Sequence, residues 1–317
     1  MINLEGIKKI ALFTHIRPDG DALGSMNGLA LALRKMGLQV DCYCDSDIPP
    51  LLSFLPNIHN VQNGAIDKDY DMLISVDCAD ELRLGKYKDF FLKHPVTVNI
   101  DHHMTNTNYA KVNIIKSTSS SCELVYEVIK SLGISFDDNI ALNLYVGTVT
   151  DTGHFTQANT TSGAHFAAGE LIKYNIDIEY LSQKLFKEIS KEKLMLIKDC
   201  ISDMRFYSGD RISLIGINQE MLSKYNLDIN ETEGIINYAI NIRGVLIGVC
   251  LTESAKNSYK VSLRSKNGVN VADVAAAFGG GGHLQAAGFM INGCYEDVIE
   301  RIIQACEKAL ENYDRVC

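Results

Sequence analysis

The chain has 317 residues, of which 46% are hydrophobic and 22% charged, and its formal net charge is −9. This length allows two ordinary domains with separate cores, whereas the acidity argues against long duplex nucleic acid, which usually needs an extended basic surface. No apolar run reaches the roughly 18 to 20 residues of a membrane span and the N-terminus shows no signal-peptide pattern, so we expect a cytoplasmic protein that does not contact a membrane.

Strand-like and helix-like segments alternate through the first half of the chain. Apolar runs predict strands at 9–14, 38–44, 71–76 and 96–100, and apolar positions at helical spacing predict helices at 21–36, 122–132, 139–149 and 161–174. This alternation is typical of the α/β fold class, with a mostly parallel sheet and helices on both of its faces. We therefore expect a first domain over 1–185 whose sheet has about five strands.

The second half of the chain has a different texture. Residues 178–204 form a charged amphipathic segment without Gly or Pro, which predicts a helix, and we expect 186–204 to link two domains. Strands are then expected at 211–217, 245–253, 259–265 and 289–291, and helices at 271–278 and 297–312. These elements predict a smaller α+β domain over 205–317, and we expect the active site in a cleft between the two domains.

Acidic and histidine residues gather in four short, widely spaced segments of the first domain. The residues concerned are His15, Asp19, Asp21, Asp77, Asp101, His102, His103 and Asp151. Three of the segments follow apolar runs, and open α/β sheets bind their ligands at the carboxyl ends of strands. Carboxylates gathered at one sheet edge repel one another strongly without cations, so this pattern predicts a metal site.

Each of these residues alone has a structural alternative. Asp21 suits the N-cap of the first helix, and Asp77 suits a turn at the end of its strand. Their joint occurrence favours metal binding instead. Carboxylates and imidazoles without a thiolate suit Mn²⁺ or Mg²⁺. Six or seven ligands exceed the needs of one ion, whereas two ions ~3.5–4 Å apart that share a bridging Asp use them all. Hydrolysis of a phosphate ester is the natural use of such a site.

Longer motifs around these residues resemble those of the DHH phosphoesterase family. They are HIRPDGDALGS, SVDCAD, the Asp101-His102-His103 triplet, TDTGHF and FGGGGHLQAAG, and the resemblance extends from His15 to about Gly288. It implies that His15, Asp19 and Asp77 hold one metal, and that Asp21, Asp77, His102 and Asp151 hold the other. By the same resemblance, His103 faces the substrate phosphate and Asp101 orients a histidine.

The second half resembles the DHH-associated C-terminal domain. This resemblance assigns substrate binding to the glycine-rich loop with Gly280, Gly281, Gly282 and His283. It also implies that Arg264 clamps a terminal phosphate, which suits the bidentate guanidinium group. Arg243 is a plausible second contact, and a surface arginine is the alternative.

The length and the glycine-rich loop favour the compact two-domain group of this family, which comprises oligoribonucleases (nanoRNases) and 3′-phosphoadenosine-5′-phosphate phosphatases. This resemblance implies hydrolysis of short, single-stranded, 5′-phosphorylated oligonucleotides to mononucleotides, together with dephosphorylation of 3′-phosphoadenosine-5′-phosphate. Two divalent cations are expected as cofactors, with Mn²⁺ favoured over Mg²⁺. A stand-alone cyclic di-AMP phosphodiesterase and a non-catalytic nucleotide-binding module are the alternatives. The sequence leaves the general acid, the polarity of degradation and the oligomeric state open, and a homodimer is compatible with it.

Overall fold

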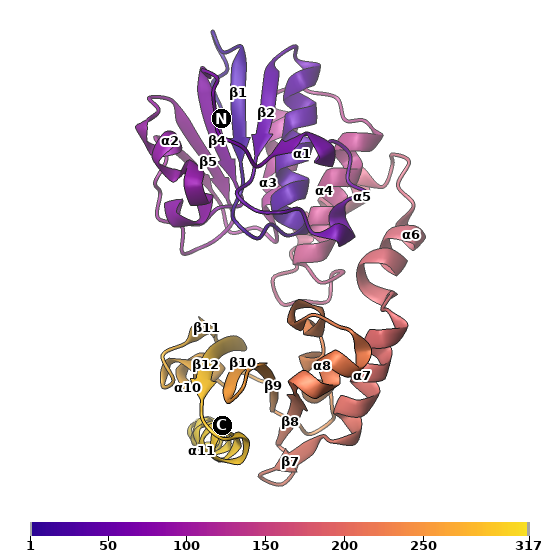
Figure 1. The fold of residues 1–317 in the computed structure, drawn as a ribbon. Coiled ribbons are helices and arrows are strands. Elements are labelled where there is room, and N and C mark those ends of the chain that lie inside the picture. Colours follow the sequence, from indigo (N-terminus) through magenta and orange to yellow (C-terminus); the bar gives the residue numbers. More distant parts are fainter. Residues whose placement is uncertain (1, 316–317) are drawn as a thin grey trace. The chain divides into compact units, whose positions relative to one another are not determined.

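The computed structural model describes residues 2–315, which form two compact units divided between Glu188 and Ile189 (Figure 1). None of the helices in this range combines the length and apolar character needed to cross a bilayer. The domain boundaries and the interdomain cleft expected from the sequence stay predictions.

The first unit contains a parallel sheet of six strands in the order β3-β2-β1-β4-β5-β6. Its strands are β1 (Lys9–Phe13), β2 (Gln39–Tyr43), β3 (Val61–Gln62), β4 (Met72–Val76), β5 (Thr97–Asp101) and β6 (Val112–Ile115). The expectation of five strands was therefore one too low. The sequence located only four of the strands; the two that it missed are β3, which has two residues, and β6, whose residues are partly buried or exposed.

Helices cover both faces of this sheet, as expected. The helices are α1 (Gly20–Lys35), α2 (Lys88–Lys93), α3 (Ser121–Ser131), α4 (Asp138–Asp151), α5 (Ser162–Leu171) and α6 (Ile178–Ser182). Figure 1 shows α1, α3, α4 and α5 on one side of the sheet and α2 on the other. On the side of α2, Phe13 of β1 packs with Leu84, which belongs to the 3-10 helix η3 (Glu81–Tyr87), and with Phe91 of α2. The α/β fold class is thus confirmed.

The strand order reverses beside β1. The chain passes from β1 outward to β2 and β3, and then returns to β4 on the other side of β1. In doubly wound sheets, ligands bind at such a switch point, in the crevice beyond the carboxyl ends of the strands. This strand order therefore predicts a ligand-binding site in the loops that follow β1 and β4.

The helix expected over 178–204 is interrupted. It consists of α6, a π-helical turn at Gln183–Lys187 and α7 (Lys191–Ser202), with Glu188 in extended conformation between them. Leu196, Ile197 and Cys200 of α7 pack into a core of the second unit. Local periodicity, which predicted one continuous helix, does not reveal this packing of α7 against the second sheet.

The second unit is an α+β domain, as expected, built on a mixed six-stranded sheet in the order β11-β12-β10-β9-β8-β7. Its elements after α7 are β7 (Arg205–Tyr207), β8 (Ile212–Ile217), α8 (Gln219–Tyr225), α9 (Ile236–Ile240), β9 (Ile247–Ala255), β10 (Ser258–Ser265), α10 (Val271–Ala276), β11 (Gly281–His283), β12 (Ala286–Asn292) and α11 (Tyr295–Asp314). Among the strands that the structure describes in this sheet, only β8 and β9 pair in parallel. Helices α10 and α11 share one core with the sheet, whereas α7, α8 and α9 share another.

Candidate metal centre

Loops at the carboxyl ends of three neighbouring strands bring the predicted residues together. His15 follows β1 by two residues, Asp77 follows β4 directly, and Asp101 is the last residue of β5. Asp77 has φ of +52°. A non-glycine residue rarely adopts this left-handed conformation, and such local strain concentrates at functional sites. The left-handed conformation of Asp77 therefore marks this edge of the sheet as a candidate functional site.

Helices α1 and α4 approach closely enough to bring Asp21 and Asp151 to the same edge. A Cβ atom on Gly20 would lie 2.2 Å from Oγ1 of Thr150, and one on Gly147 would lie 3.0 Å from Cα of Asp21. Only glycine fits at these two positions. The contact sets the second residue of α1 beside the last residue of α4. Asp151 is thus the last residue of α4, whereas the helix expected over 139–149 would have ended before it.

Nitrogen and oxygen atoms of these residues form three groups, each with candidate ligand atoms within 4.8 Å of one another. The groups are His15–Asp19–Asp77, Asp21–His102–Asp151 and Asp77–His102–His103. Nε2 of His15 lies 3.4 Å from Oδ2 of Asp77, and Nε2 of His102 lies 3.7 Å from Oδ1 of Asp77. Asp77 therefore stands between the two histidines. We refer to the residues of these three groups as the carboxylate–histidine cluster.

The N-terminus of α3 holds Asp21. The backbone N–H of Ser121 donates to Oδ2 of Asp21 at 2.6 Å, and that of Cys122 donates to Oδ1 at 2.8 Å. Ser121 also donates its hydroxyl to Oδ1 of Asp77 at 2.9 Å. The positive end of the helix dipole thus compensates part of the cluster's negative charge.

The N-cap of α1 is Asp19, not Asp21. Oδ1 of Asp19 accepts from the backbone N–H groups of Asp21 and Ala22. The capping alternative considered for Asp21 is therefore wrong, because that carboxylate turns away from its own helix toward α3. Oδ2 of Asp19 lies 3.9 Å from Nε2 of His15.

The two histidines after β5 have different partners. Nδ1 of His102 lies 3.1 Å from the carbonyl oxygen of Thr118, which directs Nε2 toward the carboxylates of the cluster. Nδ1 of His103 instead lies 2.7 Å from Oδ1 of Asp101. Asn106 donates to the other oxygen of Asp101 at 2.6 Å. Asp101 is completely buried, and its two carboxylate oxygens hold His103 and Asn106 in place.

Proton affinities in the cluster reflect burial and crowding. Burial, together with the charges of Asp77 and Asp151, raises the pKa of Asp21 well above its ordinary value. Burial raises the pKa of Asp151 to about 6. Burial also acts to raise the pKa of Asp77, but contact with His15 and the charges of His102 and His103 outweigh it and hold that pKa below its usual range. A cluster in which two carboxyl groups resist ionisation is one that cations would stabilise.

The donor set fits divalent cations. It offers carboxylate oxygens and imidazole nitrogens, the ligands that Mn²⁺ and Mg²⁺ accept. Cys78, next to Asp77, donates its thiol to the carbonyl oxygen of Asp80, and burial raises its pKa to about 12. That thiol stays protonated and leaves the cluster a hard-donor site.

The predicted substrate residues lie in the second unit. Arg264 of β10 and His283 of β11 both stand opposite Ala286 of β12, so the three residues share one row across the sheet. The end of the glycine-rich stretch, Gly281–His283, forms strand β11 rather than a loop, because its backbone pairs with β12. Arg243 lies in the turn between α9 and β9, exposed and without a hydrogen bond or ion pair within residues 2–315.

Sequence reasoning missed several residues that contact the cluster. Ser121, Asn106 and Arg83 were not among the predicted site residues. Asn106 binds Asp101, and Nη2 of Arg83 lies 2.9 Å from Nδ1 of His15. No local pattern identifies such residues, because each reaches the cluster from a separate loop or helix.

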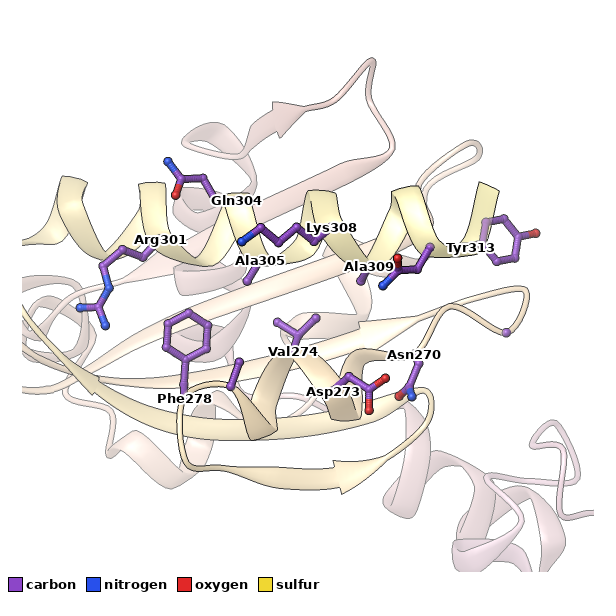
Figure 2. Close-up of a pocket in the computed structure, with 13 residues that line it drawn as sticks. Asn270, Asp273, Val274, Phe278, Arg301, Gln304, Ala305, Lys308, Ala309 and Tyr313 are labelled. Carbon is purple, nitrogen blue, oxygen red and sulfur yellow. The ribbon is translucent and has the colours of Figure 1, made fainter. Parts of the chain in front are cut away.

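A groove of about 570 Å³ in the second unit contains none of the predicted site residues (Figure 2). It lies between α10 and α11, and Val274, Phe278 and Ala305 contribute to its apolar walls. The guanidinium of Arg301 lies 5.7 Å from the centre of the Phe278 ring. The groove thus has a basic edge, but it is separate from the row of Arg264 and His283.

Comparisons with known proteins identify similar domains and similar whole chains. The N-terminal domain of the DHH family matches residues 9–148, and the DHHA1 domain matches residues 217–312. A bifunctional oligoribonuclease and PAP phosphatase from Thermus thermophilus is 30% identical over 95% of this chain and 90% of its own length. Its Bacillus subtilis counterpart is 28% identical over 96% of each chain. The crystal structure of an exopolyphosphatase-related protein from Bacteroides fragilis has a TM-score of 0.88 and 28% identity, covering 96% of this chain and 93% of that one.

Proposed function

Because the chain belongs to the DHH family of phosphoesterases, we propose that it hydrolyses short 5′-phosphorylated oligoribonucleotides to mononucleotides and dephosphorylates 3′-phosphoadenosine-5′-phosphate. The names of the relatives from Thermus thermophilus and Bacillus subtilis support these two activities. The observation that carries the proposal is the carboxylate–histidine cluster, in which Asp77 stands between His15 and His102. Such a cluster suits the cleavage of a phosphate ester more than the binding of a nucleotide without chemistry.

We assign two divalent cations to the cluster. His15, Asp19 and Asp77 would hold one, and Asp21, Asp77, His102 and Asp151 would hold the other. Imidazole nitrogen in both sets favours Mn²⁺ over Mg²⁺, which prefers oxygen ligands and retains several waters. Such cations supply Lewis-acid stabilisation of the phosphate and activation of a water nucleophile.

The remaining residues of the first unit would position the phosphate. His103 is held by Asp101 through Nδ1, which leaves its Nε2 to donate to a phosphate oxygen. Contact with Asp101 raises the pKa of His103, so its ring carries a positive charge over a wider pH range. That charge would stabilise the negative charge that develops on the phosphate.

In the second unit, Arg264 and His283 would bind the terminal phosphate of the substrate. Their alignment opposite Ala286 gives two donors on one face of the sheet. Gly280, Gly281 and Gly282 would let a phosphate approach the backbone, and Arg243 would add a further contact. Recognition of a terminal phosphate would restrict the enzyme to small nucleotides and short single strands.

The products of three substrates test this function. Metal-free protein is given Mn²⁺ or Mg²⁺ and then a 5′-phosphorylated dinucleotide, a 5′-phosphorylated pentanucleotide or 3′-phosphoadenosine-5′-phosphate. We expect AMP from the adenine-containing dinucleotide and from 3′-phosphoadenosine-5′-phosphate, with slower turnover of the pentanucleotide. Faster turnover of cyclic di-AMP than of its linear form would instead identify a cyclic dinucleotide phosphodiesterase.

We also propose that the protein acts in the cytoplasm. Eight of its cysteines, among them the exposed Cys294, are free thiols. Free thiols are typical of a reducing compartment, and short RNA fragments and adenine nucleotides would be available there.

A further inference from the structure

One guanidinium group reaches the carboxylate–histidine cluster. Nη2 of Arg83 lies 2.9 Å from Nδ1 of His15. Within residues 2–315, no other Arg or Lys side chain forms a hydrogen bond or ion pair with a member of the cluster. Arg83 is therefore the cation that the first unit places beside this acidic site.

The backbone fixes Arg83 in this place. The N–H of Ile16 donates to the carbonyl oxygen of Arg83 at 2.8 Å, which ties η3 to the loop after β1. Two residues further on, a Cβ on Gly85 would lie 2.4 Å from Oδ2 of Asp45 and 2.9 Å from Cγ2 of Ile16, so only glycine allows η3 to come this close. The position of the guanidinium thus follows from the packing of η3.

Nδ1 of His15 has two neighbours that make opposite demands. The carbonyl oxygen of Ile16, 2.8 Å away, needs a proton on Nδ1, whereas Arg83 can only donate and needs a lone pair there. Both cannot be satisfied together. When Nε2 faces a cation, the proton of the neutral ring resides on Nδ1 and goes to Ile16, as in other metal-binding histidines. Arg83 then lacks an acceptor.

We propose that Arg83 is a further substrate-positioning residue, which leaves His15 and donates to a phosphate oxygen of the substrate once the cluster holds its cations. This inference rests on the proposed function, because a phosphoesterase brings a phosphate to this site. A planar guanidinium group with several donors suits the oxygens of a phosphate. Arg83 would complement His103: the His15 that Arg83 contacts follows β1, whereas His103 follows β5, and β4 with Asp77 at its end lies between these two strands.

The test compares three variants of the full chain. Arg83→Gln removes the charge and the donor fork, and Arg83→Lys keeps the charge alone. Lys88→Gln removes a charge from the adjoining α2, where the side chain of Lys88 has no hydrogen bond or ion pair among the described residues. Mn²⁺ affinity is measured by electron paramagnetic resonance. AMP affinity is then measured by calorimetry, with the protein metal-free and with it saturated by Mn²⁺.

We expect Arg83→Gln to weaken AMP binding to the Mn²⁺-saturated protein by about 10- to 100-fold, because one charge-assisted contact is lost. Its AMP affinity without metal and its Mn²⁺ affinity should not fall. Arg83→Lys should show a smaller loss, and Lys88→Gln none. Unchanged AMP binding by Mn²⁺-saturated Arg83→Gln would overturn the inference. A fall in Mn²⁺ affinity that accounts for the whole effect would overturn it too, since Arg83 would then only orient His15. Failure of the wild-type protein to release AMP from either substrate would reject the proposed function instead.

Discussion

Nδ1 of His103 and Oδ1 of Asp101 lie 2.7 Å apart, and Asp101 is completely buried at the end of β5. The carboxylate that precedes the histidine pair is therefore directed at the second histidine of the pair, not the first. His102 finds its own partner in the carbonyl oxygen of Thr118. The centres of the two rings lie 4.5 Å apart and the ring planes are inclined by 62°, so the two adjacent histidines point toward different partners.

The first prediction concerns the proton affinity of His103. Because Asp101 raises the pKa of His103, Asp101→Asn should lower it in the metal-free protein. The raised pKa contributes stability that is fully present below the unfolded pKa of about 6.5 and is lost as pH rises through the folded pKa. An NMR titration of the His103 ring measures the shift. The exposed Asp69→Asn serves as control, and an unaltered His103 titration in Asp101→Asn would contradict this assignment.

The second prediction concerns cation binding and pH. Burial raises the pKa of Asp151 to about 6, so the stability that its protonation gives the metal-free protein is present below about pH 3.8 and is lost as pH rises through about 6. We expect Mn²⁺ to raise the melting temperature at pH 7.5 by about 5 to 10 °C at roughly 100 times its Kd. The rise should be much smaller at pH 5, where protons compete for the carboxylates. Calorimetric melting curves with equal stabilisation at both pH values would count against the cluster as the cation site.

The gathering of site residues at one sheet edge could be predicted from the sequence, whereas the contacts that hold these residues in place could not. Strand-like runs ahead of His15, Asp77 and Asp101 place their side chains at one edge, because the carboxyl ends of parallel strands meet there. The clamp on Asp21 depends on the N-terminus of α3, about one hundred residues away in the chain. Tertiary packing alone creates that contact, and local patterns do not reveal it.

The third prediction concerns Arg264. Arg264→Gln should raise the KM for a 5′-phosphorylated dinucleotide by about 10- to 100-fold, because a charge-assisted contact to the terminal phosphate is lost. The same dinucleotide without its 5′-phosphate should show no such change. Lys260 lies on the same face of β10 and is exposed, so Lys260→Gln is the matched control. Equal loss with both dinucleotides would refute a role in binding the terminal phosphate.

The fourth prediction separates two neighbouring glycines of β11. Gly282 has φ of +149°, and a Cβ there would lie 2.4 Å from the carbonyl oxygen of Ala286, whereas Gly281 faces open space. Gly282→Ala should therefore lower the free energy of unfolding by about 1 to 3 kcal/mol, and Gly281→Ala should leave it nearly unchanged. Urea unfolding measures both. Equal stability of the two variants would be inconsistent with the β11–β12 pairing described above.

In the second unit too, some elements could be predicted from the local sequence, whereas one depends on its packing against a neighbouring strand. The helix that contains Val271 and Val274 and the strand that contains Arg264 were predicted within a few residues. The glycine-rich stretch was expected to be a loop, but pairing with β12 makes its last three residues, Gly281–His283, an edge strand. Glycine disfavours strands locally, so this strand forms through its neighbour rather than through its own propensity.

The central claim is that the carboxylate–histidine cluster, centred on Asp77, cleaves phosphate esters of small nucleotides with divalent cations. Its most direct test measures AMP release from a 5′-phosphorylated diadenylate by metal-free wild-type protein, by Asp77→Asn and by Asp69→Asn, each with and without added Mn²⁺. We predict Mn²⁺-dependent release by the wild type and Asp69→Asn, and a loss of at least about 100-fold in Asp77→Asn. Release by Asp77→Asn at the wild-type rate, or release that needs no cation, would contradict the claim.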